Sequence, residues 1–266
     1  MSALLAVPIF VPLLCAALTM IAYRHRDLQR FIAVAALVAV LVDAILLLIR
    51  VEADGVQSVQ VGAWPAPIGI TLVADMFSAL MLVISIATVL AVLVFAIGQP
   101  GADQDQPVFH PVYLVMTAGV SLSFLTGDLF NLFVAYEITL AASYVLITMG
   151  GRREQVRTGM TYIIINLLAS TLFVVGIAWV YAATGTMNLA DLSVKIAALP
   201  DGVQTALSMF LFLVFGIKAA IFPMFFWLPD SYPTARTPVT AVFAGLLTKV
   251  GVYSIVRTQT LLFPET

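Results

Sequence analysis

Three charged residues lie far inside apolar segments of this sequence, where their side chains could exchange protons. Glu137, Lys218 and Lys249 each stand within a run long enough to cross a bilayer. A charge near the bilayer midplane costs about 2.5–3.5 kcal/mol on insertion scales, so a chain that carries several has a reason to keep them. A low dielectric disfavours the charged ammonium of a lysine, and a nearby carboxylate restores it. A Glu–Lys pair that is made and broken would therefore act as a proton switch.

A static ion pair that joins two helices is the alternative interpretation of these charges. Two lysines share one central glutamate, so fixed pairing would leave one lysine over. Polar residues also recur every four positions along one predicted helix. Such a face either holds waters beside the lysines or makes ordinary interhelical hydrogen bonds. The residues concerned are Thr158, Tyr162, Asn166 and Ser170.

Pro223 follows Lys218 within one apolar segment and predicts a kinked helix. Proline removes a backbone hydrogen bond and bends a helix. Carbonyl groups freed at membrane depth are tolerated where they line a wet cavity or are buried in protein. Broken helices with polar residues at the break are typical of transporter ion sites, so this segment favours proton exchange over static pairing.

Weaker candidates surround this set. Thr248 and Tyr253 flank Lys249 and could extend its polar path, although aromatic packing explains Tyr253 equally well. Asp43 lies in an otherwise apolar segment, where it either pairs with another subunit or stays protonated. His110 opens a predicted helix, and we favour a surface role for it over a proton relay.

The sequence contains no constellation for enzyme catalysis or cofactor binding. It has no Walker loop, no cluster of Cys or His and no G-x-S-x-G motif. We therefore predict a secondary-active transporter subunit rather than an enzyme, with no cofactor and no metal. A net charge of −2 without a basic stripe predicts no nucleic-acid partner. Ion movement would be driven by another gradient or by a partner's redox reaction.

The composition requires a lipid bilayer as the solvent for much of the surface. Of 266 residues, 62% are hydrophobic and 10% are charged, whereas a soluble domain carries about 25% charged residues. A membrane-spanning helix needs about 20 apolar residues. We predict an all-α polytopic membrane protein with about eight transmembrane helices. The predicted spans are Leu4–Tyr23, Phe31–Ile49, Phe77–Ile97, Val112–Leu125, Leu129–Thr148, Met160–Ala183, Ala206–Leu228 and Val239–Val256.

Local signals between the spans predict further elements. Asp75 and Asp128 stand at helix starts, where capping is the expected role. Val56–Ile70 predicts an extended hairpin or loop on the outer surface. Asn188–Leu199 predicts a short amphipathic helix along the membrane interface.

Basic residues in the loops predict the orientation of the chain. If the N-terminus is outside, seven Lys or Arg residues fall in inward loops and three in outward segments. The inward residues are Arg24, Arg26, Arg30, Arg152, Arg153, Arg157 and Arg236, and the outward ones are Arg50, Lys195 and Arg257. This asymmetry predicts that both termini lie outside.

Three stretches of sequence resemble one family of membrane subunits. Phe130–Glu137 (FNLFVAYE) resembles the fifth-helix motif of antiporter-like subunits, which occur in Mrp-type cation/proton antiporters, respiratory complex I and membrane-bound hydrogenases. Lys218–Pro233 (KAAIFPMFFWLPDSYP) and Phe243–Tyr253 (FAGLLTKVGVY) are similar to the D-type subunit of Mrp antiporters. Complex I homologues usually have a histidine before Trp-Leu-Pro, where this chain has Phe225-Phe226.

The resemblance implies a role for each buried charge. In that family a fifth-helix glutamate modulates a seventh-helix lysine, and protons move along a hydrated central axis. These roles fall on Glu137 and Lys218, with Lys249 as the eighth-helix lysine. Members usually contain about fourteen helices built from two inverted repeats. We therefore expect the N-terminal part only: residues 1–110 with helices one to three, and residues 111–266 with helices four to eight as one ion-translocating repeat.

The function implied by the resemblance is that of a subunit of a multi-subunit Na⁺/H⁺ (monovalent cation/proton) antiporter in a bacterial cell membrane. Its partners would be other hydrophobic subunits, with Na⁺ and H⁺ as the transported ions. One alternative is a proton-pumping membrane subunit of a respiratory NADH dehydrogenase or hydrogenase-type redox complex. Another is a structural membrane subunit whose buried pairs only hold helices together.

Overall fold

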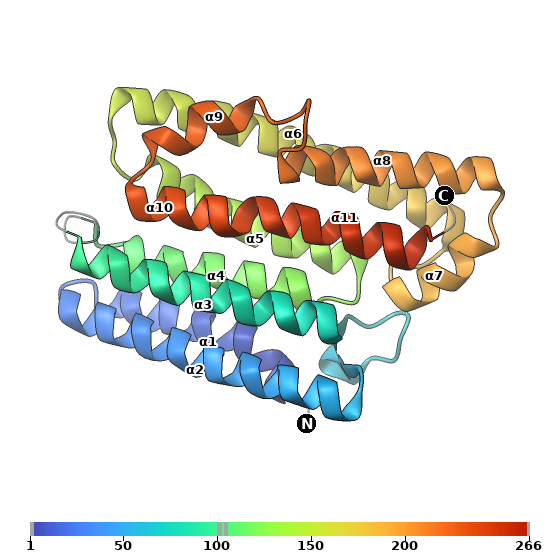
Figure 1. The fold of residues 1–266 in the computed structure, drawn as a ribbon, viewed down its shortest axis with the longest axis horizontal. Coiled ribbons are helices and arrows are strands. Elements are labelled where there is room, and N and C mark those ends of the chain that lie inside the picture. Colours follow the sequence, from blue (N-terminus) through green and yellow to red (C-terminus); the bar gives the residue numbers. More distant parts are fainter. Residues whose placement is uncertain (1–2, 100–102, 104–105, 265–266) are drawn as a thin grey trace.

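Long apolar helices that run alongside one another form most of the fold (Figure 1). The computed structural model describes residues 3–99, 103 and 106–264. Within them, seven helices are long and apolar enough to cross a membrane, with α10, η3 and α11 counted as one, and α4 is a shorter apolar helix. The long elements are α1 Ala3–Ile21, α2 Arg26–Asp54, α3 Met76–Gly98, α4 Phe109–Leu125, α5 Leu129–Thr148, α6 Arg153–Thr184, α8 Asp201–Ala219, α10 Thr237–Val242, η3 Phe243–Leu247 and α11 Thr248–Leu262.

The remaining described elements are short and connect the long helices. They are β1 Gln57–Gln60, η1 Val61–Ala63, β2 Thr71–Ala74, α7 Leu189–Ala197, α9 Trp227–Ser231 and η2 Tyr232–Thr234. The all-α polytopic architecture predicted from hydropathy is therefore confirmed.

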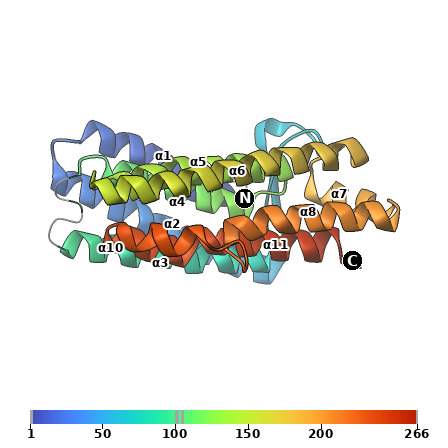
Figure 2. The same ribbon diagram turned by 90° about the horizontal axis from the view of Figure 1, so that it is seen from above.

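The helices are arranged in two layers, which the view from above separates (Figure 2). One layer holds α1, α4, α5 and α6, which pack in that order. The other holds α2, α3, the α10–α11 segment and α8. Contacts of α1 with α2 and of α6 with α8 join the layers.

Helix α4 lies at the centre of this arrangement. It packs against α1, α3 and α5, and nearly all of its residues are buried. It begins at Phe109, so that it is longer than the predicted span Val112–Leu125. A short helix can cross the core here because protein, rather than lipid, surrounds it.

A two-stranded antiparallel sheet closes one end of the bundle. β1 pairs with β2, and Gln57 lies opposite Ala74. The backbone N–H of Gly127 donates to the Thr71 carbonyl at 2.8 Å, which ties the turn before α5 to the sheet. The hairpin predicted within Val56–Ile70 does form, but its second strand, Thr71–Ala74, lies just after those residues. The amphipathic helix is also confirmed as α7, which buries Leu189, Leu192 and Ile196.

Side-chain caps start two of the long helices, as predicted. The Asp75 carboxylate accepts from the Ser78 N–H, and the Ser78 hydroxyl accepts in return from the Asp75 N–H. The Asp128 carboxylate accepts from the Asn131 N–H at 2.8 Å. Such caps satisfy backbone donors that have no partner within the helix.

The predicted span Ala206–Leu228 is wrong as a single kinked helix, because the chain stops and restarts within it. Helix α8 ends at Ala219, Ala220 has φ of 54°, and Pro223 lies in the turn before α9. The Trp227 indole N–H donates to the Ile217 carbonyl at 3.1 Å, which satisfies one acceptor freed by the break.

The eighth span contains a π-helical turn, η3, which ends at Leu247, two residues before Lys249. Downstream, Gly251 brings α11 against the end of α8: a Cβ at this position would lie 2.6 Å from the backbone nitrogen of Ala219. The break in α8 and the first turn of α11 are therefore held together by close backbone contact.

Candidate functional site

One serine hydroxyl connects the half-buried acid to the buried base. Ser170 Oγ, on α6, donates to Glu137 Oε1, on α5, at 2.5 Å. Lys218 Nζ, in the last turn of α8, donates to Ser170 Oγ at 3.1 Å. The Lys218 ammonium and the Glu137 carboxylate form no direct ion pair within 4.0 Å among the described residues. The predicted Glu–Lys pair is therefore bridged by a hydroxyl and not direct.

The aromatic ring of Tyr136 covers the same ammonium. Lys218 Nζ lies 4.8 Å from the Tyr136 ring centroid, within the range of a cation–π interaction. Both side chains are buried, with 4% of Lys218 and 3% of Tyr136 exposed. Sequence reasoning missed Tyr136 because a buried aromatic residue is usually a packing residue, and its only distinctive signal was its place beside Glu137.

A small cavity lies next to the lysine. Its volume is about 20 Å³, which is room for about one water molecule. The polar residues that line it include Tyr162, Asn166 and Lys218. The Tyr162 hydroxyl is within 2.8 Å of Ser143 Oγ, and the Asn166 amide donates to the Tyr162 carbonyl. Three members of the predicted polar face, including Ser170, thus gather on the buried side of α6.

Among the described residues, Lys249 lies outside this site. Its position on α11 is exposed, and Lys249 Nζ donates to the Ala244 carbonyl at 2.5 Å and to Thr248 Oγ1 at 3.3 Å. Val250 lines the small cavity from the buried face of α11 instead. The two lysines predicted to share one path therefore point to different environments in this chain.

Tyr253 also lies apart from Lys249, on the buried face of α11. Its hydroxyl donates to the Phe124 carbonyl at 2.9 Å and accepts from Arg257. Arg257 in turn donates to both carboxylate oxygens of Asp75, at 2.5 and 2.7 Å. Tyr253 stands one turn after Lys249, but among the described contacts its hydroxyl does not join the lysine. Its ring packs on Phe77 and Phe124, in line with the aromatic-packing alternative.

The Asp75–Arg257 pair lines a larger cavity of about 440 Å³ at the sheet end of the bundle. Burial by itself would raise the pKa of Asp75, but hydrogen bonds from Arg257 and from the Ser78 N–H lower it to about 2. Asp75 therefore stays ionised at neutral pH and remains paired with Arg257.

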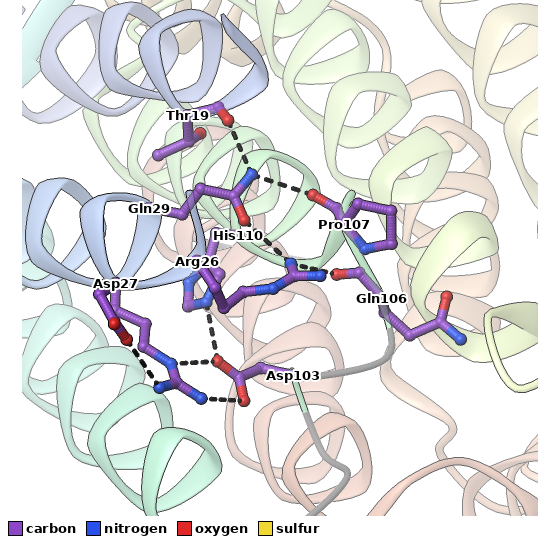
Figure 3. A network of polar contacts seen from close by, with 9 residues as sticks. Thr19, Arg26, Asp27, Gln29, Asp103, Gln106, Pro107 and His110 are labelled. Carbon is purple, nitrogen blue, oxygen red and sulfur yellow. Dashed lines mark hydrogen bonds and ion pairs between the residues drawn. The ribbon is translucent and has the colours of Figure 1, made fainter. Parts of the chain in front are cut away.

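A second buried network joins α2, α4 and the segment between α3 and α4 (Figure 3). Asp103 accepts from Arg30 at 2.7 and 2.9 Å and lies 3.1 Å from His110 Nε2. Burial by itself would raise the pKa of Asp103, but the hydrogen bonds from Arg30 and His110 hold it below its usual value. His110 is fully buried, so the predicted surface role for it is wrong.

Asp43 is buried on α2 with 6% exposed, and its Oδ2 has no hydrogen-bond partner among the described residues. The same residues hold no cluster of three or more His, Cys, Asp or Glu that could bind a metal ion. Glu137, Ser170 and Lys218 link an acid, a hydroxyl and a base across α5, α6 and α8.

These features define a class: a polytopic membrane protein with a carboxylate and a buried lysine bridged by a serine hydroxyl beside an interrupted helix. The chain belongs to the NADH:quinone oxidoreductase/Mrp antiporter transmembrane family, whose model matches residues 126–266. It is 42% identical to the D-type subunit of the Na(+)/H(+) antiporter of Alkalihalophilus pseudofirmus, across 99% of this chain and 54% of that protein. It is also 42% identical to the D-type subunit of a probable K(+)/H(+) antiporter of Rhizobium meliloti, across 98% of this chain and 49% of that protein.

Two solved complexes contain chains of the same fold. A chain of the Mrp complex from Dietzia sp. DQ12-45-1b has a TM-score of 0.93 and 35% identity, across 99% of this chain and 50% of that one. A chain of the membrane-bound sulfane sulfur reductase, an archaeal respiratory membrane complex, has a TM-score of 0.89 and 27% identity, across 97% and 53%. The chain spans about half the length of the curated relatives it matches.

Proposed function

We propose that this chain serves in a multi-subunit Na⁺/H⁺ antiporter and that Glu137, Ser170 and Lys218 carry the proton. The observation that supports the proposal is the Ser170 hydroxyl, which contacts the acid and the base at once. The curated relatives named as D-type subunits of Na(+)/H(+) antiporters support the choice of transported ions. Its partners would be other hydrophobic subunits of a bacterial cell membrane complex, and its N-terminus would lie outside.

The relay needs no atom beyond the three side chains. The Ser170 hydroxyl gives its proton to Glu137 Oε1 while it takes one from the Lys218 ammonium. The products are a neutral carboxylic acid and a neutral amine, and Ser170 is unchanged. The reverse transfer restores the two charges, so a change in the field at either end sets the direction. The energy would come from the gradient of the other transported ion.

Lys249 is a further proton carrier in this proposal. Its ammonium is held by the Ala244 carbonyl within the π-helical turn η3, and π-helical turns are frequent at functional sites. Transfer between Lys218 and Lys249 would require water or groups beyond the contacts described here. Thr248 would support Lys249, since its hydroxyl accepts from the same ammonium.

The test uses the complete complex in everted membrane vesicles, with Na⁺-dependent collapse of ΔpH as the readout. We expect Lys218→Ala and Glu137→Ala to abolish exchange while the complex still assembles. The matched control is Lys195→Ala, because Lys195 lies on the surface helix α7, where it pairs with Asp191. Wild-type exchange by an assembled Lys218→Ala complex would contradict the relay.

A redox-linked proton pump is the second candidate, because a chain of a respiratory membrane complex shares the fold at 27% identity. Purification of the native complex discriminates the two. Iron–sulfur or flavin subunits in the purified complex would favour the pump, whereas hydrophobic subunits without redox centres would favour the antiporter.

A purely structural role for the buried charges is tested by removing both. A Glu137→Leu and Lys218→Met double variant has no uncompensated buried charge, so its helices should still pack. Retained exchange in this variant would support the structural role, and lost exchange in an assembled complex would support the relay.

A further inference from the structure

Tyr136 contacts the Lys218 ammonium through its ring face and a different helix through its hydroxyl. The ring centroid lies 4.8 Å from Lys218 Nζ. The Tyr136 hydroxyl lies 2.9 Å from Ser254 Oγ on α11. One residue of α5 therefore spans from α8 to α11.

The number of hydroxyl protons available shows whether Tyr136 or Ser254 is the donor. Ser254 Oγ donates its single proton to the Val250 carbonyl at 2.9 Å. It can then only accept from Tyr136, so the tyrosine is the donor. This bond fixes the hydroxyl end of the ring, and Phe173 and Phe215 pack against the ring at centroid distances of 6.1 and 6.2 Å. The ring has little freedom to turn its face away from the lysine.

The Lys218 ammonium has few other described contacts. Lys218 has three N–H donors, and its described contacts are the Ser170 hydroxyl and the Tyr136 ring. The ionisable groups near it are Glu137, reached through Ser170, and Tyr162, which lines the same small cavity. On α11, Val250 lines the cavity and Ser254 lies one turn further along the same buried face. Neither residue carries a charge.

We propose that Tyr136 is a positioning residue whose ring face holds the Lys218 ammonium in line with Ser170 before its proton is transferred. This inference rests on the proposed relay. Glu137 reaches the ammonium only through the Ser170 hydroxyl, so it does not by itself fix where the ammonium lies. The negative face of the aromatic ring attracts a cation without accepting a proton from it. The ring thus places the charged lysine for transfer through Ser170, and it cannot divert the proton.

Fluorination of the ring provides the test, because fluorine withdraws electron density from the ring face with little change in shape. Phenylalanine and its mono-, di- and trifluoro derivatives are placed at position 136 by nonsense suppression in the complete complex. We expect Tyr136→Phe to keep most of the exchange rate and each added fluorine to lower it. Removal of the ring in Tyr136→Leu should lower the rate by about tenfold or more.

The matched control is the same fluorinated series at Phe173, which packs on Tyr136 but is not among the described contacts of the ammonium. The rate should not follow the number of fluorines there. A flat rate across the series at position 136, in complexes that assemble normally, would overturn the role of Tyr136. Lys218→Ala in the same vesicles distinguishes failure of the Tyr136 role from failure of the relay. Loss of exchange in Lys218→Ala together with a flat fluorine series rejects only the role of Tyr136. Wild-type exchange by Lys218→Ala rejects the relay itself.

Discussion

Glu137 and Lys218 share the hydroxyl of Ser170, and within the described part of the chain they form no direct ion pair. A direct ion pair would hold its charges until the helices moved apart. A bridging hydroxyl can instead donate and accept together, so a proton can cross between the two groups by small displacements.

Ser170→Ala should therefore slow Na⁺-dependent proton exchange by about a hundredfold, which is the lower part of the range for loss of a proton-transfer group. Ser170→Thr keeps a hydroxyl and should retain much of the rate. Initial rates of ΔpH collapse in everted vesicles measure both. Ser193→Ala serves as the control, since Ser193 is on the exposed side of α7 and donates to the Ala190 carbonyl. Equal rates for Ser170→Ala and the wild type would show that protons bypass the hydroxyl.

The ion pair between Asp75 and Arg257 should make stability fall in acid. The pKa of Asp75 is lowered from its ordinary value of 3.8 to about 2 in the folded protein. A lowered pKa stabilises the fold above the unfolded value, and this stability is lost as pH falls through the folded value. The contribution is about 2 kcal/mol, present at pH 5 and lost between about pH 4 and pH 2.

Thermal unfolding in detergent as a function of pH measures this effect. Asp75→Asn should be less stable than the wild type at pH 5, and the difference should shrink towards pH 2. Asp54→Asn is the control, because Asp54 is exposed at the end of α2. A constant difference at every pH would mean that the effect comes from the helix cap and not from the charge.

Asp103→Asn should destabilise the fold by about 3 kcal/mol, because it leaves Arg30 without its buried carboxylate partner. Asp27 also contacts Arg30, but its side chain is 97% exposed, so Asp27→Asn should change stability by less than about 0.5 kcal/mol. Denaturant unfolding of the two variants in the same detergent compares them. Similar losses for both would show that the burial of Asp103 is not what matters.

Gly251→Ala should destabilise the contact between α8 and α11 by about 1–3 kcal/mol, the usual cost of overpacking. The added Cβ would lie 2.6 Å from the Ala219 backbone nitrogen, which cannot rotate away. Gly202→Ala provides the comparison, since nothing among the described residues lies within 4 Å of a Cβ at that position. Its melting temperature should be unchanged or slightly higher. A stable Gly251→Ala variant would mean that α8 and α11 separate easily.

The spans were predictable because each is a separate run of apolar residues. The predicted Leu129–Thr148 coincides with α5, whereas α2 extends past the predicted Phe31–Ile49 to Arg26–Asp54. Hydropathy detects the part that meets hydrocarbon, and polar turns continue the helix beyond it. The caps at Asp75 and Asp128 were predictable for a similar reason, since a cap depends on residues three positions away.

His110 shows where such local reasoning stops. Its neighbours in sequence gave no reason for burial, but its partner Asp103 and the Arg30 of α2 enclose it in the folded chain. For Pro223, the sequence predicted an interruption of the helix but not the form of that interruption. The helix ends at Ala219, before the proline, and the Trp227 indole binds the Ile217 carbonyl in its last turn.

The sequence by itself determined that this is a polytopic membrane protein with charges inside the apolar segments of its later helices, because hydropathy is summed along one segment at a time. Only the tertiary structure decided that Ser170 joins Glu137 to Lys218, that Tyr136 covers the lysine and that Lys249 faces outward. Each of these depends on how a helix is rotated against neighbours from distant parts of the chain. Side-chain packing between helices sets that rotation, and no single segment encodes it.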